Sequence, residues 1–320
     1  MANIKQVAAH AGLSVACVSK YLKNASSVLP ASREKIETAI RELRYTPSKA
    51  ARSLRTKRNH TIKVVLDSIT NPFFAEIFET LRRVLESQGY TAVLQSVSRP
   101  FVPADIDGID GILVGFSSNE KRLAELIYTA ESVPVVLLHW REPLFSVPSV
   151  WSDVRCGMEL ATKHLLEAGC HRIAYVGGPT KDAISETKYE GAQDTLATFG
   201  LKLRPDWVFH GDFVFQSGYD AAQRISDKNN HPDGILCEND VLAAGVICGL
   251  HQQGIMVPEQ IRVVGFDNIP LADMYIPSIT SVALPTTAMC ERAAYMIIAL
   301  VKSSPISSCS YPPRLILRQS

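Results

Sequence analysis

The sequence has no apolar run of eighteen or more residues, and its amino terminus lacks the apolar core of a secretion signal. We therefore expect no transmembrane helix, no membrane partner and a cytoplasmic location. Its seven cysteines are odd in number, scattered and free of CxxC spacing. That usage predicts reduced thiols, most of them filling the core, rather than disulfides.

Catalytic signatures are missing as well. The chain has no GxSxG, P-loop or HExxH motif, and no GxGxxG follows a predicted strand. The eight histidines are dispersed and lack the spacing of metal ligands. We predict that the protein is not an enzyme, that it has no catalytic residue, and that it holds no cofactor or metal.

The net charge is close to zero only as an average. The chain carries +1 overall, but residues 1–60 hold twelve Lys and Arg against three Glu, a net charge of +9 that leaves −8 for residues 61–320. A cationic segment suits a polyanion, because each neutralised phosphate releases counterions. A solvated basic surface is the alternative.

Two short helical patterns lie inside this basic segment, on either side of a break at residues 12–14. Apolar side chains recur at helical spacing in both, at Ile4, Val7, Ala8 and Ala11 and then at Val15, Val18, Tyr21 and Leu22. Gly12 suits the positive φ of a tight turn, and Ser14 stands at an N-cap position. The pattern predicts a helix-turn-helix, whose second helix enters the DNA major groove, although a generic helical hairpin would share it.

The chain resembles the lactose-repressor (LacI/GalR) family of bacterial transcription regulators. VAAHAGLSVACVSKYLKN, residues 7–24, is similar to the family's amino-terminal signature, and SREKIETAIRELRYTPSKAARSLR, residues 32–55, to its third helix and hinge. The resemblance extends over nearly all of the chain. It implies a repressor that binds double-stranded operator DNA as a homodimer and takes a small-molecule effector. Cys17 and Lys20 stand where the family usually has Thr and Arg.

The expected fold is α/β: a helix-turn-helix head followed by two Rossmann-like, doubly wound lobes of periplasmic-binding-protein type. Alternating strand and helix patterns from residue 61 onward support the lobes. The predicted boundaries are 1–47 for the head, 48–60 for the hinge and 61–320 for the effector-binding and dimerisation domain. Lobe 1 covers about 61–153 and 285–303, and lobe 2 about 154–284 and 304–320. The sequence has no heptad repeat after the effector-binding domain, so we expect a dimer without a tetramerising coiled coil.

Two local features of this fold are also predicted. Ser32 is expected to open the third helix as its N-cap. Between the strands TAVLQSV and ILVGF, where the family has a full helix, only RPFVPADIDGID intervenes. We expect that crossover helix to be shortened to a turn or lost, with the parallel topology retained.

The family's DNA contacts map onto the second helix, its flanks and the hinge. By resemblance the DNA-binding residues are Ser14, Val15, Ala16, Cys17, Ser19, Lys20, Asn24, Tyr45, Ala51 and Leu54. Val15, Ala16 and Lys20 occupy the family's specificity positions. Leu54 from each of two subunits would wedge a base step open in the minor groove.

Candidate effector residues follow predicted strands, because ligands of open α/β sheets lie off the carboxyl ends of the strands. They are Phe73, Phe74, Trp140, Lys188, Phe213, Asn239, Asp240 and Asp267, with Asn71 as a weaker candidate. Aromatic faces beside carboxylates and amides suit a carbohydrate. Lys188 replaces the family's usual Arg, whose bidentate fork a Lys cannot reproduce.

Two residues that differ from the family's purine-sensing pattern bear on the class of effector. GDF…SGY and Trp140 resemble the purine-sensing member of the family, but Asp182 and Ile184 stand where that member presents Arg and Thr to the base. A sugar or sugar phosphate is therefore favoured. The alternatives are a purine- or nucleoside-responsive regulator, and a solute-binding protein without a DNA function, which would need an export signal and would have no use for the basic head.

Overall fold

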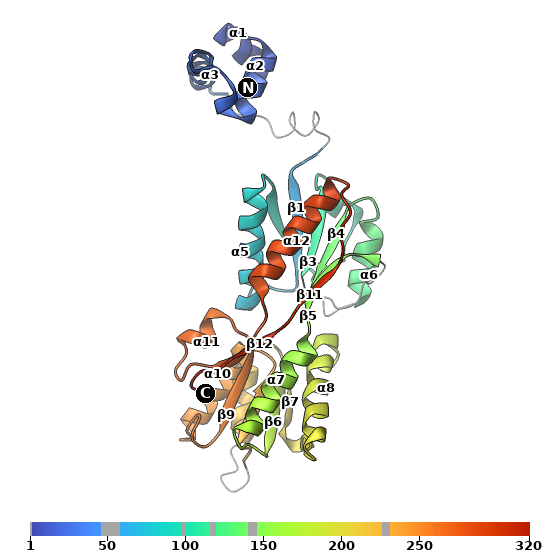
Figure 1. Ribbon diagram of the computed structural model, residues 1–320, viewed down its shortest axis with the longest axis vertical. Coiled ribbons are helices and arrows are strands. Elements are labelled where there is room, and N and C mark those ends of the chain that lie inside the picture. The colour runs from blue at the N-terminus through green and yellow to red at the C-terminus, as the bar shows by residue number, and fades with distance from the viewer. Residues whose placement is uncertain (1, 46–57, 98–99, 116–119, 140–145, 226–230) are drawn as a thin grey trace. The chain divides into compact units, whose positions relative to one another are not determined.

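The computed structural model describes residues 2–45, 58–97, 100–115, 120–139, 146–225 and 231–320 (Figure 1). The chain divides into two compact units, Met1–His60 and Thr61–Ser320. No helix in the described ranges has both the length and the apolar character needed to cross a membrane.

The first unit is built from short helices around a small core. They are α1 (Ile4–Ala11), α2 (Val15–Lys23), the 3-10 turn η1 (Ala25–Ser27) and α3 (Pro30–Glu42). Gly12 ends α1 with a φ of 64°, and the Ser14 side chain caps α2, as the sequence predicts. The buried core consists of Val7, Ala8, Ala11, Val18, Ile36 and Ala39. It joins all three helices, which confirms the helix-turn-helix packing.

The start of α3 differs from the prediction. The helix begins at Pro30, with Leu29 at the N-cap and no side-chain cap, so Ser32 lies inside the helix and does not cap it. Proline is favoured at the first helical position because its φ is already helical and its missing N–H would have had no partner there. That preference outweighed the capping pattern at Ser32.

The second unit contains two six-stranded sheets. The first has the order β11-β5-β4-β3-β1-β2 and the second β12-β10-β9-β8-β6-β7. Every pairing is parallel except that of β12 with β10. The strands of the first are β1 (Thr61–Leu66), β2 (Thr91–Ser96), β3 (Gly111–Gly115), β4 (Val135–Leu138), β5 (Ser149–Ser152) and β11 (Cys309–Tyr311). Those of the second are β6 (Ile173–Gly177), β7 (Val208–His210), β8 (Gly234–Cys237), β9 (Arg262–Asp267), β10 (Thr280–Ala283) and β12 (Arg314–Ile316).

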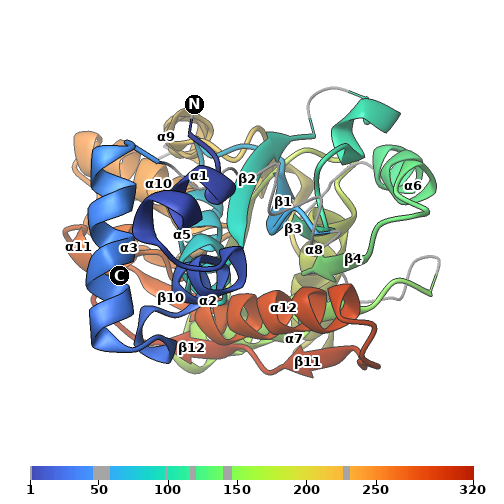
Figure 2. The same ribbon diagram turned by 90° about the horizontal axis from the view of Figure 1, so that it is seen from above.

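Helices cover both faces of each sheet, as in the predicted doubly wound lobes. On the first sheet, α5 (Pro72–Ser87) and α12 (Thr286–Val301) pack on one face and α6 (Glu120–Thr129) on the other (Figure 2). On the second, α7 (Val154–Glu167) and α8 (Ala183–Thr198) pack on one face, and α9 (Phe215–Ile225) and α10 (Asp240–Gln252) on the other. The short helix α11 (Pro270–Met274) follows β9.

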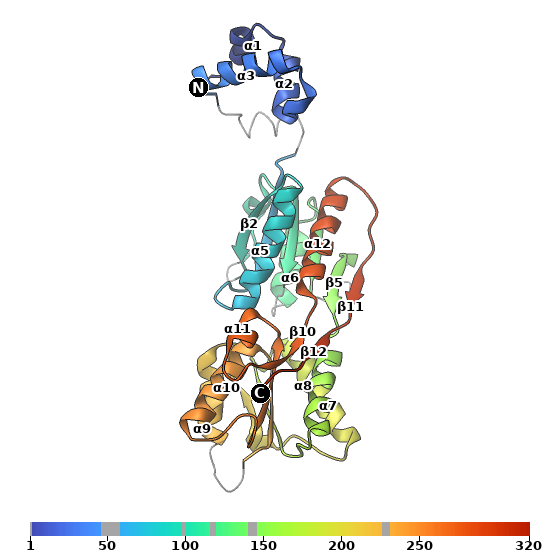
Figure 3. The same ribbon diagram turned by 60° about the vertical axis from the view of Figure 1, so that its left-hand side comes forward.

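The chain crosses between the sheets after β5, after β10 and between β11 and β12 (Figure 3). This places β11 in the first sheet, whereas the sequence predicts that residues 304–320 all belong to lobe 2. The reason is that β11 finds a partner in the edge strand β5, where Cys309 pairs with Val150. Only the following strand, β12, joins the second sheet.

The crossover between β2 and β3 is reduced to the 3-10 turn η2 (Pro103–Ile106), as the sequence indicated. A buried lysine takes up the space beneath it. Lys63, in β1, donates from Nζ to the Asp105 carbonyl oxygen and to Gln95 Oε1, the latter at 2.6 Å. The same Nζ lies 3.8 Å from Asp105 Oδ1. Lys63 and Asp105 are each 8% exposed, so a buried ion pair holds the turn against the sheet.

Candidate functional site

The outer face of α2 carries the predicted base-reading residues. Ser14 Oγ accepts a hydrogen bond from the Cys17 backbone N–H at 3.2 Å, which fixes the start of the helix. Val15 is 41% exposed, and Ala16 and Lys20 are also exposed. The opposite face carries Val18, which is fully buried. This face of the helix therefore presents a short apolar patch and the Lys20 ammonium to solvent.

The other predicted DNA contacts are less uniform. Cys17 is half-buried against the core of the first unit, as is Tyr45, and Ser19 is partly exposed. The Asn24 side chain accepts from the Ser26 backbone N–H and so caps η1. Ala51 and Leu54 lie outside the described residues.

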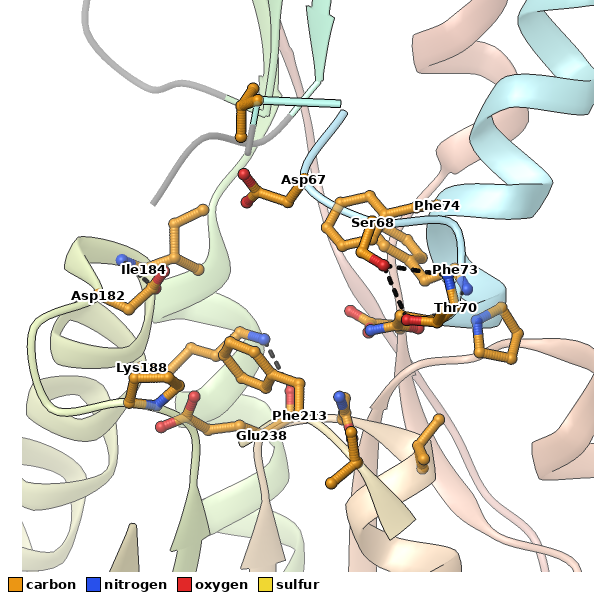
Figure 4. A pocket seen from close by; sticks show the side chains of 18 of the residues that line it. Asp67, Ser68, Thr70, Phe73, Phe74, Asp182, Ile184, Lys188, Phe213 and Glu238 are labelled. Atoms are coloured by element: carbon orange, nitrogen blue, oxygen red, sulfur yellow. Dashed lines mark hydrogen bonds between the residues drawn. The ribbon is translucent and has the colours of Figure 1, made fainter. Parts of the chain in front are cut away.

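A cleft of about 870 Å³ lies between the two lobes of the second unit, at the carboxyl ends of their strands. Figure 4 shows Phe73 and Phe74 on one side and Phe213 and Lys188 on the other. The described lining residues are Asp67, Ser68, Thr70, Asn71, Pro72, Phe73, Phe74, Val97, Arg122, Pro179, Lys181, Asp182, Ile184, Lys188, Phe213, Val214, Phe215, Glu238, Asn239, Val241 and Asp267.

The cleft brings together six of the eight predicted effector residues, Phe73, Phe74, Lys188, Phe213, Asn239 and Asp267. Trp140 lies outside the described residues. Asp240, also predicted to bind the effector, does not line the cleft, because its carboxyl group is fully buried. That carboxyl group accepts hydrogen bonds from the Ile269 backbone N–H and from Ser281 Oγ, and so ties α10 to the end of β9. Burial and the nearby Asp267 charge raise its pKa to about 8.

A buried polar network forms the lobe 2 wall of the cleft. The Glu238 carboxylate accepts from Tyr175 Oη at 2.7 Å and from Ser185 Oγ at 2.6 Å. Lys188 Nζ donates to the Glu238 carbonyl oxygen at 2.8 Å and lies 3.8 Å from the centroid of the Phe266 ring. Because these partners fix the lysine, its ammonium is a positioned charge in the wall.

Asp267 and Asn239 supply hydrogen-bonding groups to this wall. Burial raises the pKa of the Asp267 carboxyl to about 6, with the Lys188 ammonium opposing the shift and the Glu238 carboxylate adding to it. The carboxyl is therefore mostly ionised at pH 7 and acts as an acceptor. Asp267 also has a φ of 93°, a strained backbone conformation for a residue with a side chain. Asn239 is 3% exposed, and its Nδ2 has no hydrogen-bond partner among the described residues.

Two adjacent glycines at the end of β6 make room for the wall. A Cβ atom on Gly178 would lie 2.2 Å from Cζ of Phe213, and one on Gly177 would lie 2.4 Å from Glu238 Oε1. Any side chain at either position would displace the aromatic ring or the buried carboxylate. The Gly-Gly pair thus leaves room for both side chains in their observed positions.

Sequence reasoning did not select Glu238, Asp67, Arg122 or Lys181. Two of these carry a signal in the sequence, because Asp67 directly follows β1 and Glu238 directly follows β8, and strand ends are where ligands of open α/β sheets bind. Arg122 lies within α6 and reaches the cleft beside Val97, to whose carbonyl oxygen it donates. No strand-end rule would have identified it.

His139 lies behind the aromatic side of the cleft, at the end of β4. Its ring meets that of Phe73 edge to face, with centroids 5.6 Å apart. Burial and then the Lys188 charge lower its pKa to about 3. The folded protein therefore keeps His139 neutral at pH values where the unfolded chain protonates it.

This pKa shift predicts an acid-sensitive stability. Above pH 6.5 His139 is neutral in both states, so its contribution is fully present, and it is lost as the pH falls from 6.5 toward 3. Between pH 7.5 and pH 5 this histidine should lower the free energy of unfolding by about 2 kcal/mol. Urea unfolding of the parent and of His139→Asn at both pH values tests this, since Asn tolerates the positive φ of 66° at this position. An equal loss in the variant would contradict the assignment.

Family models and relatives agree with this arrangement. A model described as bacterial regulatory proteins, lacI family, matches residues 3–48, and one described as a periplasmic binding protein-like domain matches residues 162–320. The HTH-type transcriptional repressor PurR of Erwinia tasmaniensis is 31% identical over 100% of this chain and 97% of its own length. The ribose operon repressor of Halalkalibacterium halodurans is 32% identical over the same shares.

Solved structures share the fold over the whole chain. A complex of the transcriptional regulator CelR with cellobiose matches with a TM-score of 0.74 and 26% identity, covering 100% of both chains. A lac repressor dimer bound to operator and the anti-inducer ONPF matches with a TM-score of 0.84 and 22% identity, covering 99% of this chain and 98% of that one.

Proposed function

This chain belongs to the lacI family of bacterial regulatory proteins and is a DNA-binding transcriptional regulator, not an enzyme; we propose that it acts as a homodimeric, carbohydrate-responsive repressor. The observation that carries the proposal is the joint presence of an exposed α2 face on a basic head and a strand-end cleft in the body. An operator in the bacterial chromosome would place the protein in the cytoplasm.

A carbohydrate effector is supported by the chemistry of the cleft. Phe73, Phe74 and Phe213 offer apolar faces to C–H groups, and Asp267 and Asn239 offer an acceptor and a donor to hydroxyl groups. A purine remains the second candidate, because PurR repressors are among the relatives. Against it, Asp182 and Ile184 line the cleft where the purine-sensing pattern has Arg and Thr.

The proposed switch links the cleft to the hinge at residues 48–60, most of which lies outside the described residues. In this switch, ligand binding closes the cleft and shifts lobe 1, which changes the spacing of the two hinges of the dimer. The new spacing either permits the hinges to order on DNA, as in a corepressed repressor, or prevents it, as in an inducible one. The coupling is limited by the difference in ligand affinity between the two lobe arrangements, typically about 1–3 kcal/mol. A thermal-shift screen of sugars, sugar phosphates, purine bases and nucleosides tests the effector class, since a ligand that binds the folded state raises its melting temperature. Stabilisation by purines alone would exclude the carbohydrate.

Lys20→Ala is predicted to weaken binding to the best operator by about 1–3 kcal/mol and to relax the preference at one base pair. The exposed ammonium can donate to guanine O6 or N7, whereas Val15 and Ala16 can offer only apolar contact. Gel shifts on the operator and on single-base variants of it measure both effects. Uniform weakening across all sequences would instead assign Lys20 to a phosphate.

The proposed homodimer predicts a twofold-symmetric operator, because one helix-turn-helix covers one half-site. Sedimentation at micromolar protein should give twice the 35.1 kDa chain mass. A stoichiometry of two chains per operator duplex should accompany it. A monomer that retains full operator affinity would overturn this part of the proposal.

A further inference from the structure

The charges of the cleft narrow the class of effector. Building on the carbohydrate-responsive function proposed above, we infer that the cleft selects an uncharged polyhydroxy ligand and rejects the phosphate ester of the same ligand.

Three helices with side-chain N-caps begin at the cleft, and a phosphate can bind the free N–H groups of a helix N-terminus. These are α5, α8 and α10, whose N-caps Asn71, Asp182 and Asn239 all line the cleft. Each cap accepts backbone N–H groups of its own helix through a side-chain oxygen, at N–O distances of 2.7 to 3.0 Å. One N–H group in α5, two in α8 and one in α10 are therefore already used by the protein's own side chains.

The cap of α8 also carries a negative charge. Asp182 is only 6% exposed and accepts from the backbone N–H groups of both Ile184 and Ser185. Its carboxylate interacts favourably with the positive end of the helix dipole, as a bound phosphate would have done. A phosphate at the N-terminus of α8 would therefore be repelled by the Asp182 carboxylate.

The other charged side chains of the described lining do not make the cleft positive enough to favour a phosphate. The described lining residues include four carboxylates and three cations, namely Asp67, Asp182, Glu238 and Asp267 against Arg122, Lys181 and Lys188. Lys188 and Arg122 each already donate to a main-chain carbonyl oxygen, those of Glu238 and Val97. Lys181 is exposed to solvent, where its charge is screened.

The entrance beside α9 is apolar. Phe213, Val214 and Phe215 line the cleft where this helix begins. These three side chains offer a phosphate no hydrogen bond in exchange for the water it would lose, which is costly for a charged group. The C–H face of a neutral sugar would instead gain apolar contact.

Hydroxyl groups match the rest of the wall in a way that a phosphate cannot. The Asp267 carboxylate accepts hydrogen bonds, and a hydroxyl can donate to it, whereas an ionised phosphate has little to donate and is repelled. The Asn239 Nδ2 group, which has no partner in the described part of the chain, can donate to a hydroxyl oxygen. A ligand with several hydroxyls therefore has both an acceptor and a donor available in this wall.

Matched pairs of ligands test the inference on the full chain by calorimetry and thermal shift. The probes are D-ribose, D-glucose and D-fructose, each beside its 5- or 6-phosphate ester, with adenine, adenosine and inorganic phosphate as further arms. We expect at least one sugar to bind, its ester to bind about tenfold more weakly or worse, and inorganic phosphate to add nothing beyond its ionic strength.

Each result has a distinct consequence. An ester that binds as tightly as its sugar overturns this inference and leaves the carbohydrate-responsive function standing. Binding of adenine or adenosine alone, or of no probe in the panel, overturns that function and the inference with it.

A variant pair locates the cause of the selectivity. Asp182→Asn keeps a good helix cap but removes the charge, so it should reduce the discrimination against the ester by about fivefold. Asp206→Asn, in an exposed position outside the described lining, is the matched control and should keep the parent ratio. Equal ratios in both variants would show that the Asp182 charge does not exclude the ester.

Discussion

Asp267→Ala is expected to abolish the response to effector while leaving operator affinity close to that of the parent. The Asp267 carboxylate lines the cleft at the end of β9 and is an acceptor for ligand hydroxyls, whereas the operator is read by the separate head. If the ligand is an inducer, the variant would stay bound to the operator when ligand is added. If the ligand is a corepressor, the variant's operator affinity would stay low when ligand is added. The change in operator affinity on adding ligand, typically about 5- to 150-fold in allosteric proteins, should fall to none.

Two variants control for the backbone at this position. Asp267→Asn tolerates the positive φ and keeps the shape, so partial recovery of the response would separate hydrogen bonding from strain. Asn268→Ala alters the neighbouring positive-φ residue, which lies outside the described lining, and should keep the response. A normal ligand response in Asp267→Ala would mean that the carboxyl only shapes the strand end and that the binding site lies elsewhere.

Removing the Asp105 carboxylate is expected to destabilise lobe 1 strongly. In Asp105→Ala, the Lys63 ammonium loses its charge partner in the interior, and the Val102 backbone N–H loses the acceptor that it reaches at 2.9 Å. Breaking one side of a buried ion pair costs about 3–5 kcal/mol, which urea unfolding of the full chain should reveal. The melting temperature should fall with it.

A double-mutant cycle distinguishes the pair from simple loss of packing. Lys63→Met with Asp105→Asn removes both charges while keeping side chains of similar size. The double variant should lose less unfolding free energy than the two single variants lose together, by about 1 kcal/mol or more. Additive losses would show that the two side chains stabilise the turn independently.

The architecture could be predicted from the sequence because it depends on local patterns of residues. The 3.6-residue spacing of Ile4, Val7, Ala8 and Ala11 and the positive φ at Gly12 are decided within a few residues, and the structure reproduces both. Buried strands such as β3 and β4 also read directly as short apolar runs. Strand ends then converge by topology, which is why Phe73, Phe213 and Asp267 meet in one cleft.

What failed depends on long-range choices. Asp240 follows a strand just as Asn239 does, yet its side chain turns inward to Ile269 and Ser281, and no local pattern distinguishes the two orientations. The pairing of β11 with β5 joins segments far apart in sequence. Lys63 in the middle of a buried strand could not be assigned a partner before η2 was placed.

The central claim is that a ligand in the strand-end cleft controls the affinity of the head for operator DNA. The most direct measurement is a fluorescence-anisotropy titration of operator duplex with the full chain, with and without a saturating concentration of the sugar that raises the melting temperature most. We predict a change in operator affinity of about 5- to 150-fold, in either direction, that disappears in Asp267→Ala. A sugar that binds the parent, loses binding in Asp267→Ala and yet leaves the parent's operator affinity unchanged would contradict the claim.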